Sequence, residues 1–137
     1  MNKRLHIAAW VAQIILAIVF AMTGALKTFL APAELFRMLP DVAGFPLPLV
    51  RFIGIAELAA AAGLILPALT RIAPFLTPVA AAGVIVVMMG AFAFHVHGGH
   101  FTKLPLVIVL GVLAGFVAWA RFTRARVVPR EMAAVSC

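Results

Sequence analysis

The chain has 137 residues, of which 66% are hydrophobic and 11% charged, with a formal net charge of +7 and a mean hydropathy of +1.19. A soluble globule of this size needs more polar surface than this composition supplies, so a water-soluble domain is excluded. The positive charge does not indicate nucleic-acid binding, because it is concentrated near the two ends of the chain, as in membrane proteins with basic cytoplasmic segments. The sequence therefore predicts an all-α, polytopic integral membrane protein in a lipid bilayer.

Four apolar segments, each near the roughly 20 residues that a helix needs to cross a bilayer, predict a four-transmembrane-helix bundle. They cover residues 7–26, 47–66, 73–94 and 104–120. Prolines and glycines mark the connections between them. We expect a single transmembrane domain over residues 1–121, followed by a basic cytoplasmic tail over residues 122–137.

Lysine and arginine are distributed unevenly between the two sides of this predicted bundle. One side carries seven of them: Lys3, Arg4, Arg71, Arg121, Arg124, Arg126 and Arg130. The other side carries four: Lys27, Arg37, Arg51 and Lys103. By the positive-inside rule, both termini are expected in the cytoplasm. The first segment has the basic start of a signal peptide, but its about 20 apolar residues exceed the usual signal core of roughly 7 to 15, so we expect it to remain as a span.

Residues for redox or metal chemistry are sparse. The single cysteine, Cys137, cannot form an intrachain disulfide, so thiol and disulfide exchange with quinones by this chain alone is excluded. His95, His97 and His100 form an HxHxxH string, but helical residues two apart point about 200° apart, which is a poor metal site. Bis-histidine haem ligation is disfavoured because the remaining histidine, His6, lies at the opposite membrane face.

Small residues that let membrane helices approach closely occur in every span. In the second span, Gly54 and Ala61 flank Glu57. The fourth span contains Gly111 and Gly115 as a GxxxG pair. We favour packing within the chain, and a homodimer through Gly111 and Gly115 is the alternative.

Glu57 is the residue that needs an explanation, because it lies inside the apolar segment 47–66. An ionisable side chain in hydrocarbon costs about 2.5–3.5 kcal/mol on insertion scales, so such groups face the protein interior and find partners. With a rise of about 1.5 Å per residue, Arg51 lies roughly 5 Å and Glu57 roughly 13 Å from the outer end of the span. Lys27 and His95, near the outer ends of neighbouring spans, share the level of Arg51. We therefore predict a polar cluster that opens toward the outer face.

Lys27 is the favoured partner of Glu57. Arg51 precedes Glu57 by six residues, which places it about 120° away around the helix, so a direct pair is awkward. The flexible stem of Lys27 can reach down while Glu57 reaches up. His95 is the second candidate. Two interpretations stay open: an ion pair that only fixes helix register, and a site that relays protons or binds a ligand.

The connection after the first span contains a short amphipathic segment, residues 32–39. Pro32 stands at a suitable first helical position, and apolar residues alternate with Glu34 and Arg37. We expect a helix at the membrane interface, either as a lid over the polar cluster or as a simple anchor.

The order of these features resembles the DoxX-like family of small four-helix bacterial membrane proteins. The resemblance covers about residues 5–121 and is carried by GALK at 24–27, the prolines at 40 and 46, RFIGIAEL at 51–58, LP at 66–67 with the proline at 74, and GAFAFH at 90–95. It implies four transmembrane helices in the bacterial inner membrane. It also implies that Lys27, Arg51, Glu57 and His95 occupy the family's recurring polar positions.

The resemblance also carries an expectation about function. The family is named after the small subunit of a thiosulfate:quinone oxidoreductase, and other members are linked to membrane redox complexes. For this chain it implies an accessory or anchoring subunit of a quinone-linked system that binds a small hydrophobic ligand near Glu57. The implied partner is a membrane-associated oxidoreductase or another protein subunit. Quinone is the cofactor it suggests, with no metal and no catalytic residue evident, and we do not expect catalysis by the chain on its own.

Two other functions stay open. The first is a non-enzymatic membrane assembly or chaperone-like factor, by analogy with distant DoxX-like relatives. The second is a small proton-coupled carrier, which ranks last because four helices without a visible repeat leave little room for alternating access.

Overall fold

The computed structural model describes residues 2–135, so Cys137 lies outside the described residues. Four long helices make up the molecule: α1 (Lys3–Phe29), α3 (Leu47–Thr70), α4 (Leu76–His97) and α5 (Leu104–Trp119). A π-helical turn, η3 (Ala120–Arg124), continues α5. Helices α1, α3 and α4, and the stretch Phe101–Arg124 that joins η2, α5 and η3, are long and apolar enough to cross a membrane. This confirms the predicted all-α architecture with four candidate spans.

Short elements fill the connections. The predicted interfacial helix is present as α2 (Pro32–Met38), followed by the 3-10 turn η1 (Pro40–Val42). A second 3-10 turn, η2 (Phe101–Lys103), precedes α5, and α6 (Arg130–Val135) follows η3. Proline stands in the first turn of α2, α3 and α5, where its missing N–H would have no helical partner in any case.

The ends of α1 and α3 have identifiable causes. The side chain of Asn2 accepts a hydrogen bond from the backbone N–H of Arg4 at 3.1 Å and so caps the start of α1. At the end of α3, Arg71 adopts a left-handed conformation with φ of 59°, and Ala73 follows with φ of 48°. These two residues break the helix and turn the chain into α4.

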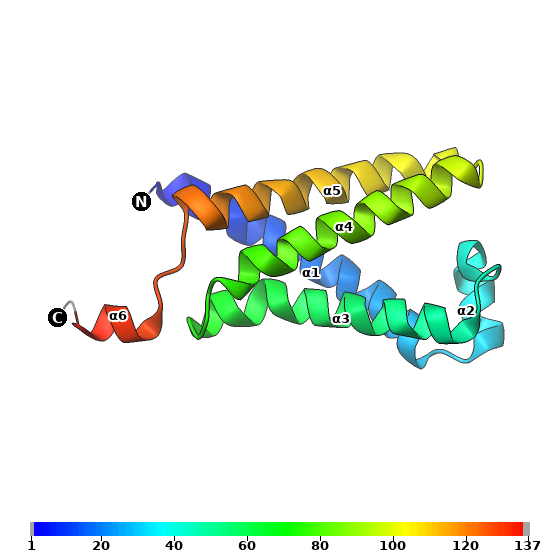
Figure 1. Ribbon diagram of the computed structural model, residues 1–137, viewed down its shortest axis with the longest axis horizontal. Helices are drawn as coiled ribbons and strands as arrows, with labels where there is room; N and C mark the ends of the chain where they lie inside the picture. Colours follow the sequence, from blue (N-terminus) through cyan, green and yellow to red (C-terminus); the bar gives the residue numbers. More distant parts are fainter. Residues whose placement is uncertain (1, 136–137) are drawn as a thin grey trace.

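The molecule has two distinct ends (Figure 1). Both termini and the α3–α4 connection lie at one end, here called the terminal end, while α2, η1 and η2 lie at the other, here called the loop end. Helix α1 crosses behind the other three at an angle, and α4 and α5 run side by side. The chain therefore forms a bundle whose helices diverge toward the loop end.

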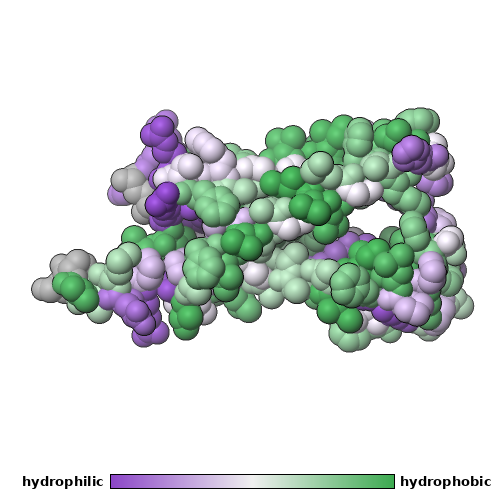
Figure 2. Space-filling model, in the orientation of Figure 1, coloured by the Kyte–Doolittle hydropathy of each residue, from purple (hydrophilic) through white to green (hydrophobic). Residues whose placement is uncertain are grey.

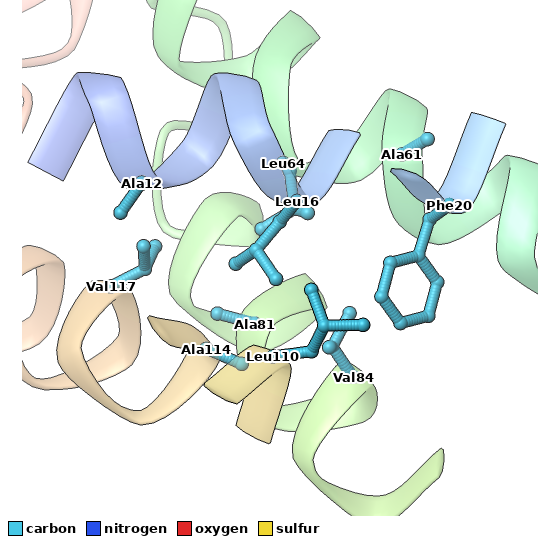
Figure 3. Close-up of a cluster of buried hydrophobic side chains, with 10 residues drawn as sticks. All are labelled: Ala12, Leu16, Phe20, Ala61, Leu64, Ala81, Val84, Leu110, Ala114 and Val117. Carbon is cyan, nitrogen blue, oxygen red and sulfur yellow. The ribbon is translucent and has the colours of Figure 1, made fainter. Parts of the chain in front are cut away.

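The hydrophobic core joins all four long helices. Figure 3 shows Leu16, Val84 and Leu110 pointing toward one another, with Phe20 beside them. The buried side chains of this cluster are Ala12, Leu16, Phe20, Ala61, Leu64, Ala81, Val84, Leu110, Ala114 and Val117. In α3 and α4 they belong to the half nearest the terminal end, so the shared core holds that half together.

The loop half of the bundle is open. In α4, the buried residues all precede Ile85: Thr77, Pro78, Ala81 and Val84. Figure 2 shows an opening through the molecule between the loop halves of α4–α5 and α1–α3, with hydrophilic side chains at its lower edge. Two contacts at the loop end join the connection before α3 to α4 and to η2. The rings of Phe45 and Phe94 are 4.9 Å apart, and Lys103 Nζ lies 3.6 Å from Asp41 Oδ2.

Helices α1 and α3 touch backbone to backbone at Gly24 and Gly54. A Cβ atom added at Gly24 would lie 2.8 Å from the carbonyl oxygen of Gly54. One added at Gly54 would lie 2.6 Å from Thr28 Oγ1 and 2.8 Å from Lys27 Cβ. Because those distances are shorter than van der Waals contact, a larger residue at either position forces the helices apart.

This contact makes a prediction about stability. Gly54→Ala should lower the free energy of unfolding in detergent by about 1–3 kcal/mol, as overpacking does, even though alanine is by itself the better helix former. Gly83→Ala is the matched control, because no atom lies within 4 Å of an added Cβ there. Thermal unfolding followed by circular dichroism measures both. A Gly54→Ala protein as stable as Gly83→Ala would contradict the close crossing.

Candidate functional site

Glu57 is buried between α1 and α3 and pairs with Lys27. Lys27 Nζ donates a hydrogen bond to Glu57 Oε1 at 2.5 Å, and the two side chains are 14% and 7% exposed. The structure therefore has the ion pair that the sequence favoured. The pair neutralises both charges in a setting where an isolated carboxylate would be very costly.

The glycine crossing explains why these two side chains meet. Lys27 follows Gly24 by one helical turn, and Glu57 follows Gly54 by one turn. The two helices are antiparallel, and side chains on a helix tilt toward its N-terminus. Lys27 therefore tilts toward the level of Glu57, and Glu57 tilts toward Lys27. The close approach at the glycines leaves a gap that the lysine stem can bridge.

Arg51 acts on the end of α1 rather than on Glu57. Its Nη1 donates to the carbonyl of Lys27 at 2.7 Å, and its Nη2 donates to the carbonyl of Leu30 at 2.6 Å. The last carbonyls of a helix lack partners within the helix and carry partial negative charge, so a guanidinium there satisfies both needs. Arg51 thus belongs to the predicted cluster as a cap that fixes the backbone of Lys27.

His95 lies near the loop end of α4 and makes no bond to Glu57 among the contacts of residues 2–135. Its ring is half-buried, and its Nδ1 is buried without a hydrogen-bond partner. The neighbouring rings are Phe94, with centroids 5.3 Å apart, and His100, with centroids 6.1 Å apart in an edge-on arrangement. The sequence-based alternative of a His95–Glu57 pair is therefore replaced by the Lys27 pair.

Three buried polar atoms in the loop half have no hydrogen-bond partner. They are Glu57 Oε2, Thr28 Oγ1 and His95 Nδ1. An unsatisfied buried polar group costs about 1–3 kcal/mol, so each indicates a place where another polar group can bind. Thr28 was missed by the sequence analysis, although its position next to Lys27 was the available signal. Its hydroxyl lies at the α1–α3 crossing, close to Gly54.

The three histidines of the string are not gathered into a three-ligand group. Within residues 2–135, no group of three or more histidine, cysteine or carboxylate side chains could hold a metal ion. His100 instead donates its backbone N–H to the carbonyl of His95 at 2.9 Å, as part of the turn that ends α4.

A second buried polar cluster lies at the terminal end and was not predicted. Gln13 is completely buried, donates from Nε2 to the carbonyl of Leu64 at 2.6 Å, and accepts from Arg121 Nε at 2.6 Å. Pro67, in the next turn of α3, has no N–H and so cannot donate to the carbonyl of Gly63, the residue before Leu64. Two signals in the sequence were available. Gln13 lies within an apolar span, and Arg121 lies at the end of another, where it was counted only toward the orientation of the chain.

Comparison with known proteins places the chain in a family. Residues 11–117 match the DoxX-like family. The chain belongs to the DoxX-like family. No curated protein and no solved structure matches it. The matched region of this DoxX-like protein contains Lys27, Arg51, Glu57 and His95, whereas Arg121 lies outside it.

The ion pair of this DoxX-like protein can be tested by stability. Glu57→Gln leaves the buried ammonium of Lys27 without a counter-charge, which should cost about 3–5 kcal/mol of unfolding free energy. The double variant Lys27→Met/Glu57→Gln should recover much of that loss, because neither charge remains. Both values come from thermal unfolding in detergent.

Lys103→Met is the control for this experiment. Its side chain is 51% exposed and lies 3.6 Å from Asp41 Oδ2, so its loss should cost less than about 1 kcal/mol. A Glu57→Gln protein no less stable than Lys103→Met would contradict a buried, mutually dependent pair.

Proposed function

We propose that this DoxX-like protein is an accessory or anchoring subunit of a quinone-linked membrane system, and that it binds the head group of a quinone beside Glu57. The observation that carries the proposal is Glu57 itself. One of its carboxylate oxygens accepts from Lys27, while the other, Oε2, is buried and unpartnered. If the carboxylate served only to fix helix register, we would expect both of its oxygens to accept hydrogen bonds within the protein.

The unpartnered atoms match the two redox forms of such a head group. A quinone carbonyl accepts hydrogen bonds, and the hydroxyl of Thr28 or an N–H of His95 can donate them. A quinol hydroxyl donates, and Glu57 Oε2 can accept. Lys27 holds the carboxylate in place through its hydrogen bond to Oε1. The site can therefore orient either form.

The apolar surroundings suit a ligand with a long tail. The opening between the loop halves of α4–α5 and α1–α3 gives a route from the lipid to the polar level (Figure 2). A groove of about 540 Å³ between α1 and α3 is lined only by apolar side chains, from Leu58 beside Glu57 to Leu66 and Ile14 toward the terminal end. An isoprenoid chain fits this surface because binding there buries apolar groups on both partners.

The proposed setting is the bacterial inner membrane with both termini in the cytoplasm. Seven of the lysines and arginines lie toward the terminal end of the bundle and four lie toward the loop end. This distribution supports the orientation through the positive-inside rule. The head-group site then lies in the outer half of the membrane. A membrane-associated oxidoreductase would be the catalytic partner.

The test is whether quinone copurifies with the protein. Wild-type protein extracted in a mild detergent should carry quinone that organic extraction and mass spectrometry detect at a defined molar ratio. Glu57→Gln should lose most of it. Glu34→Gln is the matched control, since Glu34 is an exposed carboxylate that pairs with Arg37 on the surface of α2, and it should retain wild-type occupancy.

A further variant separates loss of the site from loss of folding. Lys27→Met/Glu57→Gln should regain stability but not quinone, because the carboxylate that accepts from a quinol hydroxyl is gone. Equal trace occupancy in the wild type and in every variant would reject the quinone proposal.

A further inference from the structure

Arg121 is a buried cation at the terminal end, far from the Glu57 site. It belongs to the π-helical turn η3 and is only 3% exposed. Its Nε donates to Gln13 at 2.6 Å, and its Nη1 donates to the carbonyl of Ala125 at 2.9 Å. The guanidinium carbon lies 5.3 Å from the ring centroid of Trp10. These neutral contacts hold the side chain inward without balancing its charge.

No carboxylate of residues 2–135 forms an ion pair with Arg121. Glu57 pairs with Lys27, Glu34 pairs with Arg37, and Asp41 pairs with Lys103. The remaining acidic residue, Glu131, is exposed on α6 and lies beyond ion-pair distance of Arg121. Arginine stays protonated in proteins, so it cannot lose its charge on burial as a lysine can. The counter-charge of Arg121 must come from outside this part of the chain.

The hydrogen bonds of Arg121 are incomplete as well. Its Nη2 is buried without a partner. Its Nη1 also lies 3.1 Å from His6 Nδ1, while Trp10 Nε1 donates to His6 Nε2 at 3.1 Å. A neutral imidazole has one acceptor nitrogen, so His6 cannot accept from both donors. The terminal nitrogens of Arg121 therefore have N–H groups available for a further acceptor.

The surroundings favour an anion from the membrane surface. Basic residues gather at this end of the bundle, both in the first turn of α1 and after α5. The segment after Ala125 has no regular structure up to α6. At the start of α6, the backbone N–H of Arg130 donates a hydrogen bond to the carbonyl of Arg71 at 3.2 Å, which ties this segment to the end of α3. Ala125 is completely buried beside Ala9 and Ala120, so access to the guanidinium from the level of lipid head groups requires this segment to move aside.

We propose that Arg121 anchors a binding site for the phosphate group of an anionic phospholipid at the terminal end of the bundle. The phosphate replaces the carbonyl of Ala125 and accepts from Nη1 and Nη2 together, in the bidentate geometry that guanidinium and phosphate share. Gln13 holds the guanidinium edge in place through Nε. The lipid then supplies the negative charge that residues 2–135 do not place beside Arg121, and this site is independent of the quinone proposal.

The experiment uses full-length protein, purified and stripped of lipid in dodecyl maltoside. Dioleoyl-phosphatidylglycerol, dioleoyl-phosphatidylcholine or inorganic phosphate is titrated in, and the melting temperature is followed by circular dichroism. Phosphatidylglycerol should raise the melting temperature of the wild type in a saturable manner, because a ligand that binds only the folded state stabilises it. Phosphatidylcholine, which is zwitterionic, should have little effect.

Three variants locate the effect. Arg121→Lys keeps the charge but loses the planar guanidinium that donates two parallel hydrogen bonds. It should raise the half-saturating amount of phosphatidylglycerol by roughly tenfold or more. Gln13→Glu keeps Arg121 but supplies an internal counter-charge, and should weaken the lipid effect to a similar extent. Arg124→Gln removes one exposed charge from the same turn and should behave like the wild type.

The outcomes separate the explanations. Equal responses of the wild type, Arg121→Lys and Gln13→Glu would overturn the site, and so would a loss in Arg124→Gln as large as in Arg121→Lys. If Arg121→Lys does not fold, Gln13→Glu alone decides. A saturable shift with inorganic phosphate that the same two variants abolish would support the anion site and assign it to free phosphate.

Discussion

The backbone contact between Gly24 and Gly54 is the constraint on which the loop half of this protein depends. It brings α1 and α3 so close that no side chain fits between them at that level. The ion pair of Lys27 and Glu57 then forms one turn away on each helix, and Arg51 reaches across to the carbonyls that end α1. Because α1 and α3 are joined here by backbone contact and by charge, they do not need α4 and α5 to hold them, and the second pair of helices can diverge toward the loop end.

Much of this arrangement could be predicted from the sequence, because membrane insertion imposes strong rules. Helix number follows from hydropathy, and the Lys27–Glu57 pair follows from depth along each span together with the cost of an isolated carboxylate. The roles of Arg51 and His95 could not be separated in this way. Depth placed both at one level, but whether a long guanidinium bonds to a carboxylate or to helix-end carbonyls depends on the crossing of α1 and α3. That crossing is a property of packing, which hydropathy does not encode.

The cluster around Arg121, in contrast, could not be predicted from the sequence. An arginine near the end of an apolar span fits the positive-inside rule so well that its charge was fully explained as a signal for orientation. The π-helical turn instead carries it into the interior, where Gln13 from the first span meets it. The two buried charged residues among the described residues, Glu57 and Arg121, thus differ in kind. Glu57 has its counter-charge within the chain, whereas Arg121 has only neutral partners among the described residues.

The bond between Gln13 and Arg121 also bears on how the protein is made. It joins residues 108 positions apart, on the first and fourth candidate spans, so it cannot form until the ribosome has delivered the fourth span to the membrane. The α1–α3 pair needs only the first half of the chain and can assemble earlier in synthesis. Closure of the terminal end is then the late step of biogenesis, and a nascent chain that stops before Arg121 leaves Gln13 without its arginine partner. The buried arginine thereby distinguishes a completed bundle from an unfinished one.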